Sequence, residues 1–85
     1  MDAPDRLLTS EGQTADSEWD AGDIGCGELA LGLRLHLGGM SPGRVLKLIA
    51  RDPGARADIP AWCLLTGHAL VMEQHPVYLI RRKET

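Results

Sequence analysis

The sequence predicts an α/β protein of the α+β kind, a two-layer sandwich with the order β-α-β-α-β-β. Two helices would pack on one face of a four-stranded mixed sheet, so that each element buries its apolar side. Three observations lead to this prediction. Turns rich in Gly, Pro, Asp and Ser divide the chain after residue 16 into six short segments. Two segments are rich in helix-forming residues and stop at glycine, and the other four are short stretches, alternating or largely apolar, that are typical of strands.

The length and composition fit one small domain with an aliphatic core. The chain has 85 residues, of which 44% are hydrophobic and 25% are charged, which is ordinary for a globular protein. Aromatic residues are few, namely Trp19, Trp62 and Tyr78. Residues 1–16 are rich in Asp, Glu, Ser, Thr and Gly, so we expect a disordered tail there and the folded domain over residues 17–85.

Charge and cysteine content exclude several classes of protein. The formal net charge is -3 and the isoelectric point is near 5.5, which argues against a general nucleic-acid binder. We expect the basic run Arg81–Lys83 to be a solvated strand end. No apolar run reaches the roughly 18 residues of a transmembrane helix, and the N-terminus lacks the apolar centre of a signal peptide. We therefore expect a cytoplasmic protein whose two cysteines stay free.

The first half of the domain is predicted to hold one strand and one segment of ambiguous type. Ser17–Ala21 is a short candidate strand with Trp19 and Ala21 facing inward. The leucines of Leu29–Leu37 alternate with the period of a strand, but they also recur at the i, i+4 spacing of a helix. The absence of β-branched residues favours a helix, although Gly32 costs that helix about 1 kcal/mol relative to Ala.

The second half is predicted to contain a strand, a helix and a hairpin. Arg44–Ala50 is an apolar strand that ends at an Asp-Pro-Gly turn. Asp58–Pro60 is typical of a helix entrance, because Asp caps free N–H groups and Pro is tolerated in the first turn. That helix continues over Ala61–Thr66. Ala69–Glu73 and Val77–Ile80 are then two strands of an antiparallel hairpin.

The candidate functional residue is Cys26, which lies between two glycines directly before the Leu-rich segment. A cysteine acts as a nucleophile in its thiolate form. A helix N-terminus supplies unpaired N–H groups and the positive end of the helix dipole, and both favour the thiolate. Asp23 and Glu28 oppose ionisation, so we expect modest activation. The alternative at this point is a loop cysteine without a function.

The other cysteine and the histidines have structural interpretations. We expect Trp62, Leu65 and Cys63 to face the core from the second helix, where a buried cysteine behaves as a small apolar residue. The alternative is a redox pair of Cys63 with Cys26, which requires Cα atoms within about 7 Å. We expect His68 to make a structural hydrogen bond at the start of a strand. The loose spacing of cysteine and histidine predicts no metal site.

Several stretches of the chain match a known family in the same order. The longest runs from Asp52 to Cys63 (DPGARADIPAWC) and is followed by Thr66–Leu70 (TGHAL). Further matching positions are Asp20, Ile24, Cys26, Met40–Gly43 and Leu79–Lys83. With these residues the chain resembles the TusA/SirA-like sulfur-carrier (sulfurtransferase) family from about Trp19 to Lys83.

The resemblance implies a fold and a role for Cys26. The family fold is the same β-α-β-α-β-β sandwich, which makes Leu29–Leu37 a helix. The family's functional cysteine lies at the start of that helix and carries sulfane sulfur as a persulfide, and Cys26 occupies its position. The family pattern there is Cys-Pro-X-Pro, whereas this chain has Cys26-Gly27-Glu28-Leu29. The cysteine is therefore kept and both prolines are lost.

The leading functional hypothesis is a sulfur carrier. Cys26 would accept sulfane sulfur from a donor protein of the cysteine desulfurase or rhodanese type and relay it to an acceptor protein in a thiolation or sulfur-trafficking pathway. We expect a monomeric persulfide shuttle without cofactor, metal, membrane or direct nucleic-acid contact, and not a self-sufficient enzyme. The alternative is a non-carrying interaction or redox-regulatory module in which Cys26 is not persulfidated. The missing prolines favour this alternative, and the retained cysteine disfavours it.

Overall fold

A computed structural model describes residues 7–8 and 14–84 of the chain. From Ser17 onward the order β-α-β-α-β-β is the predicted one, and the strand bounds agree with prediction to within one residue. No helix in this described part is long and apolar enough to cross a membrane. The elements are β1 (Leu7–Leu8), β2 (Thr14–Ala15), β3 (Ser17–Gly22), α1 (Cys26–Gly38), β4 (Val45–Ala50), α2 (Ala55–Thr66), β5 (Ala69–Gln74) and β6 (Val77–Arg81).

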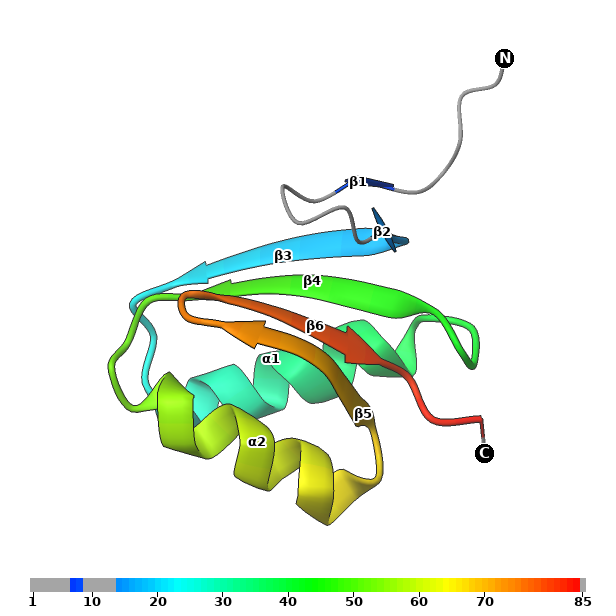
Figure 1. The fold of residues 1–85 in the computed structure, drawn as a ribbon. Helices are drawn as coiled ribbons and strands as arrows, with labels where there is room; N and C mark the ends of the chain where they lie inside the picture. Colours follow the sequence, from blue (N-terminus) through cyan, green and yellow to red (C-terminus); the bar gives the residue numbers. More distant parts are fainter. Residues whose placement is uncertain (1–6, 9–13, 85) are drawn as a thin grey trace.

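The main sheet is mixed and has four strands in the order β3-β4-β6-β5. Strands β3 and β4 are parallel, whereas β4 pairs with β6 and β6 pairs with β5 in antiparallel fashion. Both helices cover the same face of this sheet (Figure 1). Because β3 and β4 run parallel, the chain crosses back through α1, and both strands end at the same edge. The loops that lead into α1 and α2 therefore start from one edge of the sheet.

A second, two-stranded ladder lies in the segment where we expected a tail. Strands β1 and β2 pair in antiparallel fashion, and the sequence contains no clear signal for them. Ala15 is fully buried, and the Asp16 carboxylate accepts a hydrogen bond of 2.8 Å from the backbone N–H of Val45. The rest of the expected tail, residues 1–6 and 9–13, lies outside the described residues.

The burial pattern of the Leu-rich segment shows whether it is a strand or a helix. On α1, Leu29, Leu33 and Leu37 are at most 2% exposed, whereas Leu31 and Leu35 are 57% and 68% exposed. This is the i, i+4 pattern of a helix with one buried face, so the helix prediction is confirmed. The buried residues that pack together with these leucines are Ala21, Leu46, Leu48, Ala50, Ala55, Ile59, Cys63, Tyr78 and Ile80.

Helix α2 begins earlier than the sequence indicated. Its first residue is Ala55, so Asp58 lies within the first turns and does not cap the helix. The side chain of Asp52 instead accepts a hydrogen bond of 3.0 Å from the backbone N–H of Gly54, which shapes the turn before the helix. An acidic residue such as Asp58 still favours this end of the helix through the dipole. The N-cap is Gly54 and not Asp58, so the expected helix entrance was wrong by four residues.

The orientation of α2 also corrects one expected core residue. Cys63 is buried, as expected, and Trp62 is partly buried against the core. Leu65, however, is 86% exposed. The buried positions Ala55, Ile59 and Cys63 form one i, i+4 row that faces the sheet, and Leu65 lies two positions past that row, on another side of the helix. The expectation for Leu65 was therefore wrong.

Candidate functional site

The structure makes Cys26 the first residue of α1. The preceding residue, Gly25, is extended (φ -78°, ψ 178°), and its carbonyl oxygen accepts the first helical hydrogen bond from the N–H of Leu29 at 2.9 Å. The chain thus turns into the helix at the position that the sequence singled out. The side chain of Cys26 is outside the described part of the structure, so the site is built from its backbone position and its neighbours.

The N-terminus of α1 is open in two respects. Its N-cap residue is Gly25, which has no side chain to cap the helix by a hydrogen bond, so this position leaves the free N–H groups of the first turn to other partners such as solvent or a ligand. A Cβ atom built on Gly25 or on Gly27 would meet nothing within 4 Å. Cys26 therefore lies between two residues that border open space, at the end of a 13-residue helix whose dipole favours an anion.

The turn between β3 and α1 is held by the end of the neighbouring strand. The backbone N–H of Arg51, just after β4, donates to the carbonyl oxygen of Gly22 at 2.9 Å. Gly22 has a φ of 65°, a left-handed conformation that glycine adopts without steric cost. The partly buried side chain of Ile24 packs against the core further along the turn. The approach to Cys26 is thus fixed both at Gly22 and at Ile24.

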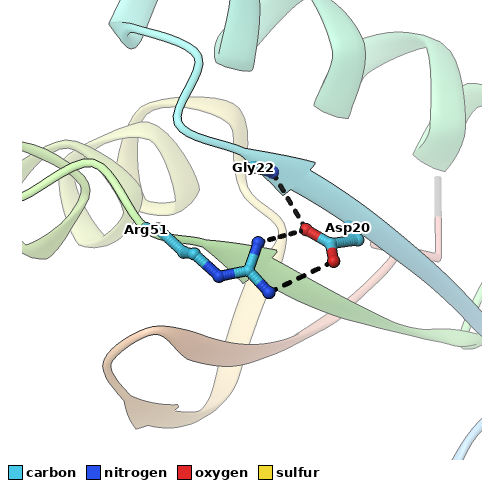
Figure 2. Close-up of polar contacts among 3 residues, drawn as sticks. All are labelled: Asp20, Gly22 and Arg51. Atoms are coloured by element: carbon cyan, nitrogen blue, oxygen red, sulfur yellow. Dashed lines mark hydrogen bonds and ion pairs between the residues drawn. The ribbon is translucent and has the colours of Figure 1, made fainter.

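Asp20 and Arg51 join the ends of the two parallel strands through their side chains. Arg51 Nη1 lies 2.7 Å from Asp20 Oδ1, and Nη2 lies 3.3 Å from Oδ2 (Figure 2). Asp20 Oδ1 also accepts a hydrogen bond of 3.0 Å from the N–H of Gly22 (Figure 2). The hydrogen bond from Arg51 is the main cause that holds the pKa of Asp20 below its ordinary value. One carboxylate therefore contacts both the residue that follows β4 and the turn that leads to α1.

The charges that precede and follow Cys26 in the chain are mostly negative. Asp20, Asp23 and Glu28 are carboxylates on exposed positions of β3, of the turn and of the first helical turn. Arg51 is hydrogen-bonded to Asp20, and this bond, followed by the charges of Asp20 and Asp23, raises the pKa of Arg51 above its ordinary value. The negative charges oppose formation of a thiolate, so the modest activation of Cys26 stays a prediction.

Cys63 has the properties of a core residue. It is 3% exposed and forms no disulfide. Burial, with a smaller contribution from the charge of Glu73, raises the pKa of the Cys63 thiol to about 11. At neutral pH the group is therefore a thiol, and a thiol is a poor nucleophile. The expected core role of Cys63 is confirmed, and the structure shows no disulfide that would link it to Cys26.

The three histidines lie in separate structural contacts. His68 Nδ1 accepts a hydrogen bond of 3.0 Å from the backbone N–H of Lys83, which confirms the structural role expected for it. The ring of His36 stacks on Trp19 with centroids 4.5 Å apart, and His75 Nδ1 lies 2.6 Å from the hydroxyl of Tyr78. Among the described residues, no three His, Cys, Asp or Glu side chains gather as metal ligands would.

Reading the sequence singled out Leu29 as a lost proline but not its place in the packing, and it did not find Arg51. Leu29, where the family pattern has its second proline, is 2% exposed and packs in the core. Its N–H also makes the first hydrogen bond of α1, which a proline cannot make. Arg51 is 31 positions from Asp20 in the sequence. Only the prediction that β3 and β4 are parallel neighbours would have brought the two together.

The fold and the site define a small two-layer α+β domain that presents one cysteine at the start of its first helix. Comparison with known proteins agrees with this class. The family described as Sulfurtransferase TusA matches residues 20–82. The chain belongs to the TusA family, and the family resemblance seen in the sequence is thereby confirmed.

The similarity to named relatives covers most of the chain. The chain is 40% identical over 77 residues to the sulfur carrier protein TusA of Pseudomonas syringae pv. syringae. The matched region covers 86% of this chain and 92% of that protein. The proteins of the same name from Pseudomonas putida (strain GB-1) and Pseudomonas aeruginosa (strain LESB58) are each 38% identical over 74 residues. Those matches cover 82% of this chain and 92% and 94% of the two relatives.

Proposed function

We propose that this protein is a sulfur carrier that holds sulfane sulfur as a persulfide on Cys26. The observation that carries the proposal is the position of Cys26 as the first residue of α1, at a helix N-terminus whose N-cap residue, Gly25, makes no side-chain capping hydrogen bond. The membership of the TusA family supports it, as do relatives that are named sulfur carriers. We place the relay in the cytoplasm, where reducing conditions keep thiols free.

The transfer needs only thiol chemistry. The Cys26 thiolate attacks the terminal sulfur of a donor persulfide, the S–S bond of the donor breaks, and the donor leaves as a thiolate. In the second step, an acceptor thiolate attacks the terminal sulfur on Cys26, and the Cys26 thiolate is released. Each step exchanges one S–S bond for another, so no external oxidant or reductant is consumed. The N–H groups at the start of α1 stabilise the Cys26 thiolate, which attacks in the first step and is released in the second.

The sulfur must come from one protein and go to another, so the carrier needs surface for docking. We propose a donor of the cysteine desulfurase or rhodanese type and an acceptor protein in a thiolation pathway. Large exposed apolar side chains often mark such surfaces. On the helix side of the protein, Leu31, Leu35, Leu64 and Leu65 are between 57% and 87% exposed. The helix that begins with Cys26 thus also offers apolar contact area to a partner.

The second candidate is a non-carrying interaction or redox-regulatory module. It is favoured by the sequence that follows the cysteine, where Gly27 and Leu29 replace the two family prolines. Leu29 is buried in the core, so the residue that replaces the second family proline contributes to the packing of α1. In this alternative the fold would serve binding, and Cys26 would not carry sulfur.

One loading experiment separates the two candidates. The protein is incubated with a cysteine desulfurase and cysteine, and separately with polysulfide, and the masses of the intact protein and of its peptides are measured. A carrier gains one sulfur atom on the peptide that contains Cys26. Cys26→Ser abolishes the gain, and Cys63→Ala, the matched control at the buried cysteine, does not. Failure to load Cys26 from either donor would exclude the carrier.

A further inference from the structure

We propose that Arg51 is a positioning residue for Cys26, because it holds the turn before α1 and neutralises the carboxylate at the end of β3. The inference deepens the proposed function and rests on it, since it concerns how Cys26 reaches its thiolate form. Arg51 comes from the segment after β4 and not from the loop that carries the cysteine. It acts across the edge where the two parallel strands end.

The first step of the argument is geometric. Arg51 is bonded to the β3 end through its backbone and its side chain, because its N–H donates to Gly22 at 2.9 Å and its guanidinium binds both oxygens of Asp20. Figure 2 shows the two side chains facing each other directly below the start of the turn. A bidentate pair of this kind fixes direction as well as distance. Arg51 therefore sets the point from which the chain departs toward Cys26.

The second step concerns distance. Cys26 is four positions after Gly22, with three residues between them, so the two Cα atoms are at most about 14 Å apart even for an extended chain. Charges in salt solution interact over a Debye length of about 10 Å at 0.1 M ionic strength and about 30 Å at 0.01 M. Because the Asp20 carboxylate is bonded to the N–H of Gly22, we infer that the charge state of the Asp20–Arg51 pair affects Cys26 when the ionic strength is low.

The third step concerns the sign of the charges. Asp20, Asp23 and Glu28 are all carboxylates, and Arg51 interacts with the first two. A neutral residue at position 51 would leave the carboxylate of Asp20 without its partner and make the surroundings of Cys26 more negative. A neutral residue at position 20 would leave the guanidinium of Arg51 without its partner and make them more positive. The two replacements break the same contact and change the local charge in opposite directions.

The test measures the rate of alkylation of Cys26 by iodoacetamide, an uncharged reagent, as a function of pH at low ionic strength. Peptide masses assign the label to Cys26, so no second substitution is needed. Asp20 and Arg51 are each 50% exposed at the side chain, so we expect the variants to fold, and circular dichroism checks this. No sulfur donor is involved, so this test can fail while the loading of Cys26 succeeds, and the reverse.

We expect Arg51→Gln to move the midpoint of the profile to higher pH and to slow alkylation at pH 7 about two- to threefold, which is the effect of a few tenths of a pKa unit. Asp20→Asn should move the midpoint to lower pH, and Arg51→Lys should keep it near that of the parent protein. At 1 M salt, where the Debye length is about 3 Å, the shifts should largely vanish. A contact with a merely structural role would affect Asp20→Asn and Arg51→Gln in the same direction. Equal shifts of the two variants, or no shift in Arg51→Gln at low salt, would overturn the proposal.

Discussion

The indole ring of Trp19 occupies the space that a side chain at position 32 would need. A Cβ atom built on Gly32 would lie well inside contact distance of three carbons of that ring. The same ring stacks on His36 one turn further along α1. Strand β3 and helix α1 therefore approach each other closely because Gly32 has no side chain. This contact helps to position α1, the helix that begins with Cys26, against β3.

The first prediction follows from this contact. Gly32→Ala improves helix propensity by about 1 kcal/mol, but inserting a methyl group into a packed contact typically costs about 1–3 kcal/mol. We expect the steric cost to win, with a net loss of about 1 kcal/mol. Urea denaturation followed by tryptophan fluorescence measures the change.

The matched control is Gly38→Ala at the end of the same helix. A Cβ there would meet nothing within 4 Å, so only the propensity gain applies, and stability should stay equal or rise. If Gly32→Ala and Gly38→Ala were equally stable, the close approach of Trp19 would not be a determinant of stability.

The second prediction concerns the two prolines that the family pattern has and this chain lacks. Gly27 borders open space, and Pro is tolerated in the first turn of a helix. Gly27→Pro should therefore be neutral or stabilise the protein by up to about 1 kcal/mol, because it restricts the unfolded chain.

Leu29→Pro is expected to behave in the opposite way. It removes a side chain that is 2% exposed and the hydrogen bond from position 29 to Gly25. A loss of about 3 kcal/mol or more is expected, because proline removes this helical hydrogen bond and fills the space of Leu29 only in part. Thermal unfolding of the two variants measures both effects. A well-folded Leu29→Pro variant would show that the α1 N-terminus rearranges without cost.

The third prediction is a dependence of stability on pH that arises from His68. Burial, followed by the charges of Lys83 and Arg82, lowers the pKa of His68 in the folded protein below its ordinary value of 6.5. His68 therefore binds a proton more readily in the unfolded chain than in the folded protein. Lowering the pH favours the unfolded chain for this reason. The stability due to neutral His68 is fully present above pH 6.5 and declines as the pH drops below that value.

The measurement is the free energy of unfolding between pH 7.5 and pH 5.5. We expect a decline in the parent protein and a flatter profile in His68→Asn, whose side-chain oxygen can still accept from Lys83. His36→Asn keeps His68 and should keep the decline. A decline of unchanged size in His68→Asn would assign the pH dependence to other groups.

The fourth prediction concerns the exposed leucines of the helix layer. Leu65 is 86% exposed, so Leu65→Ser should change stability by no more than about 0.5 kcal/mol. If partner proteins dock on the helices, this variant loads Cys26 more slowly from a donor protein and at an unchanged rate from polysulfide. Val71→Ser, at an exposed position of β5, is the control and should load at the parent rate from both. Equal rates for Leu65→Ser and Val71→Ser with the donor protein would remove Leu65 from the docking surface.

Much of the fold was predictable because it depends on local pattern. Strand periods and glycine or proline turns placed the four strands of the main sheet to within a residue, and helix propensity favoured the correct type for Leu29–Leu37. The start of α2 was missed because Asp58 and Pro60 are residue types that often begin a helix. The turn before α2 is instead shaped by the hydrogen bond between Asp52 and Gly54. The exposure of Leu65 was missed because the row of buried residues on α2 depends on where that helix begins.

The site was predictable only in part. The position of Cys26 follows from its glycine neighbours and from the family resemblance, since both place it before a helix. The contact of Arg51 with Asp20 joins residues 31 positions apart and depends on the parallel pairing of β3 and β4. Nor does the sequence show why Gly32 interrupts an otherwise helix-forming segment, because the reason is the ring of Trp19 on another element.

The central claim is that Cys26 both receives sulfur and passes it on. The most direct measurement is a single-turnover relay in which the protein is loaded with labelled sulfur, separated from the donor, and mixed with an acceptor thiol. The account predicts that the label resides on the Cys26 peptide, leaves it with time, and appears on the acceptor in equal amount, while Cys26→Ser never holds the label. Label that never reaches Cys26, or that stays there in the presence of the acceptor, would contradict the account.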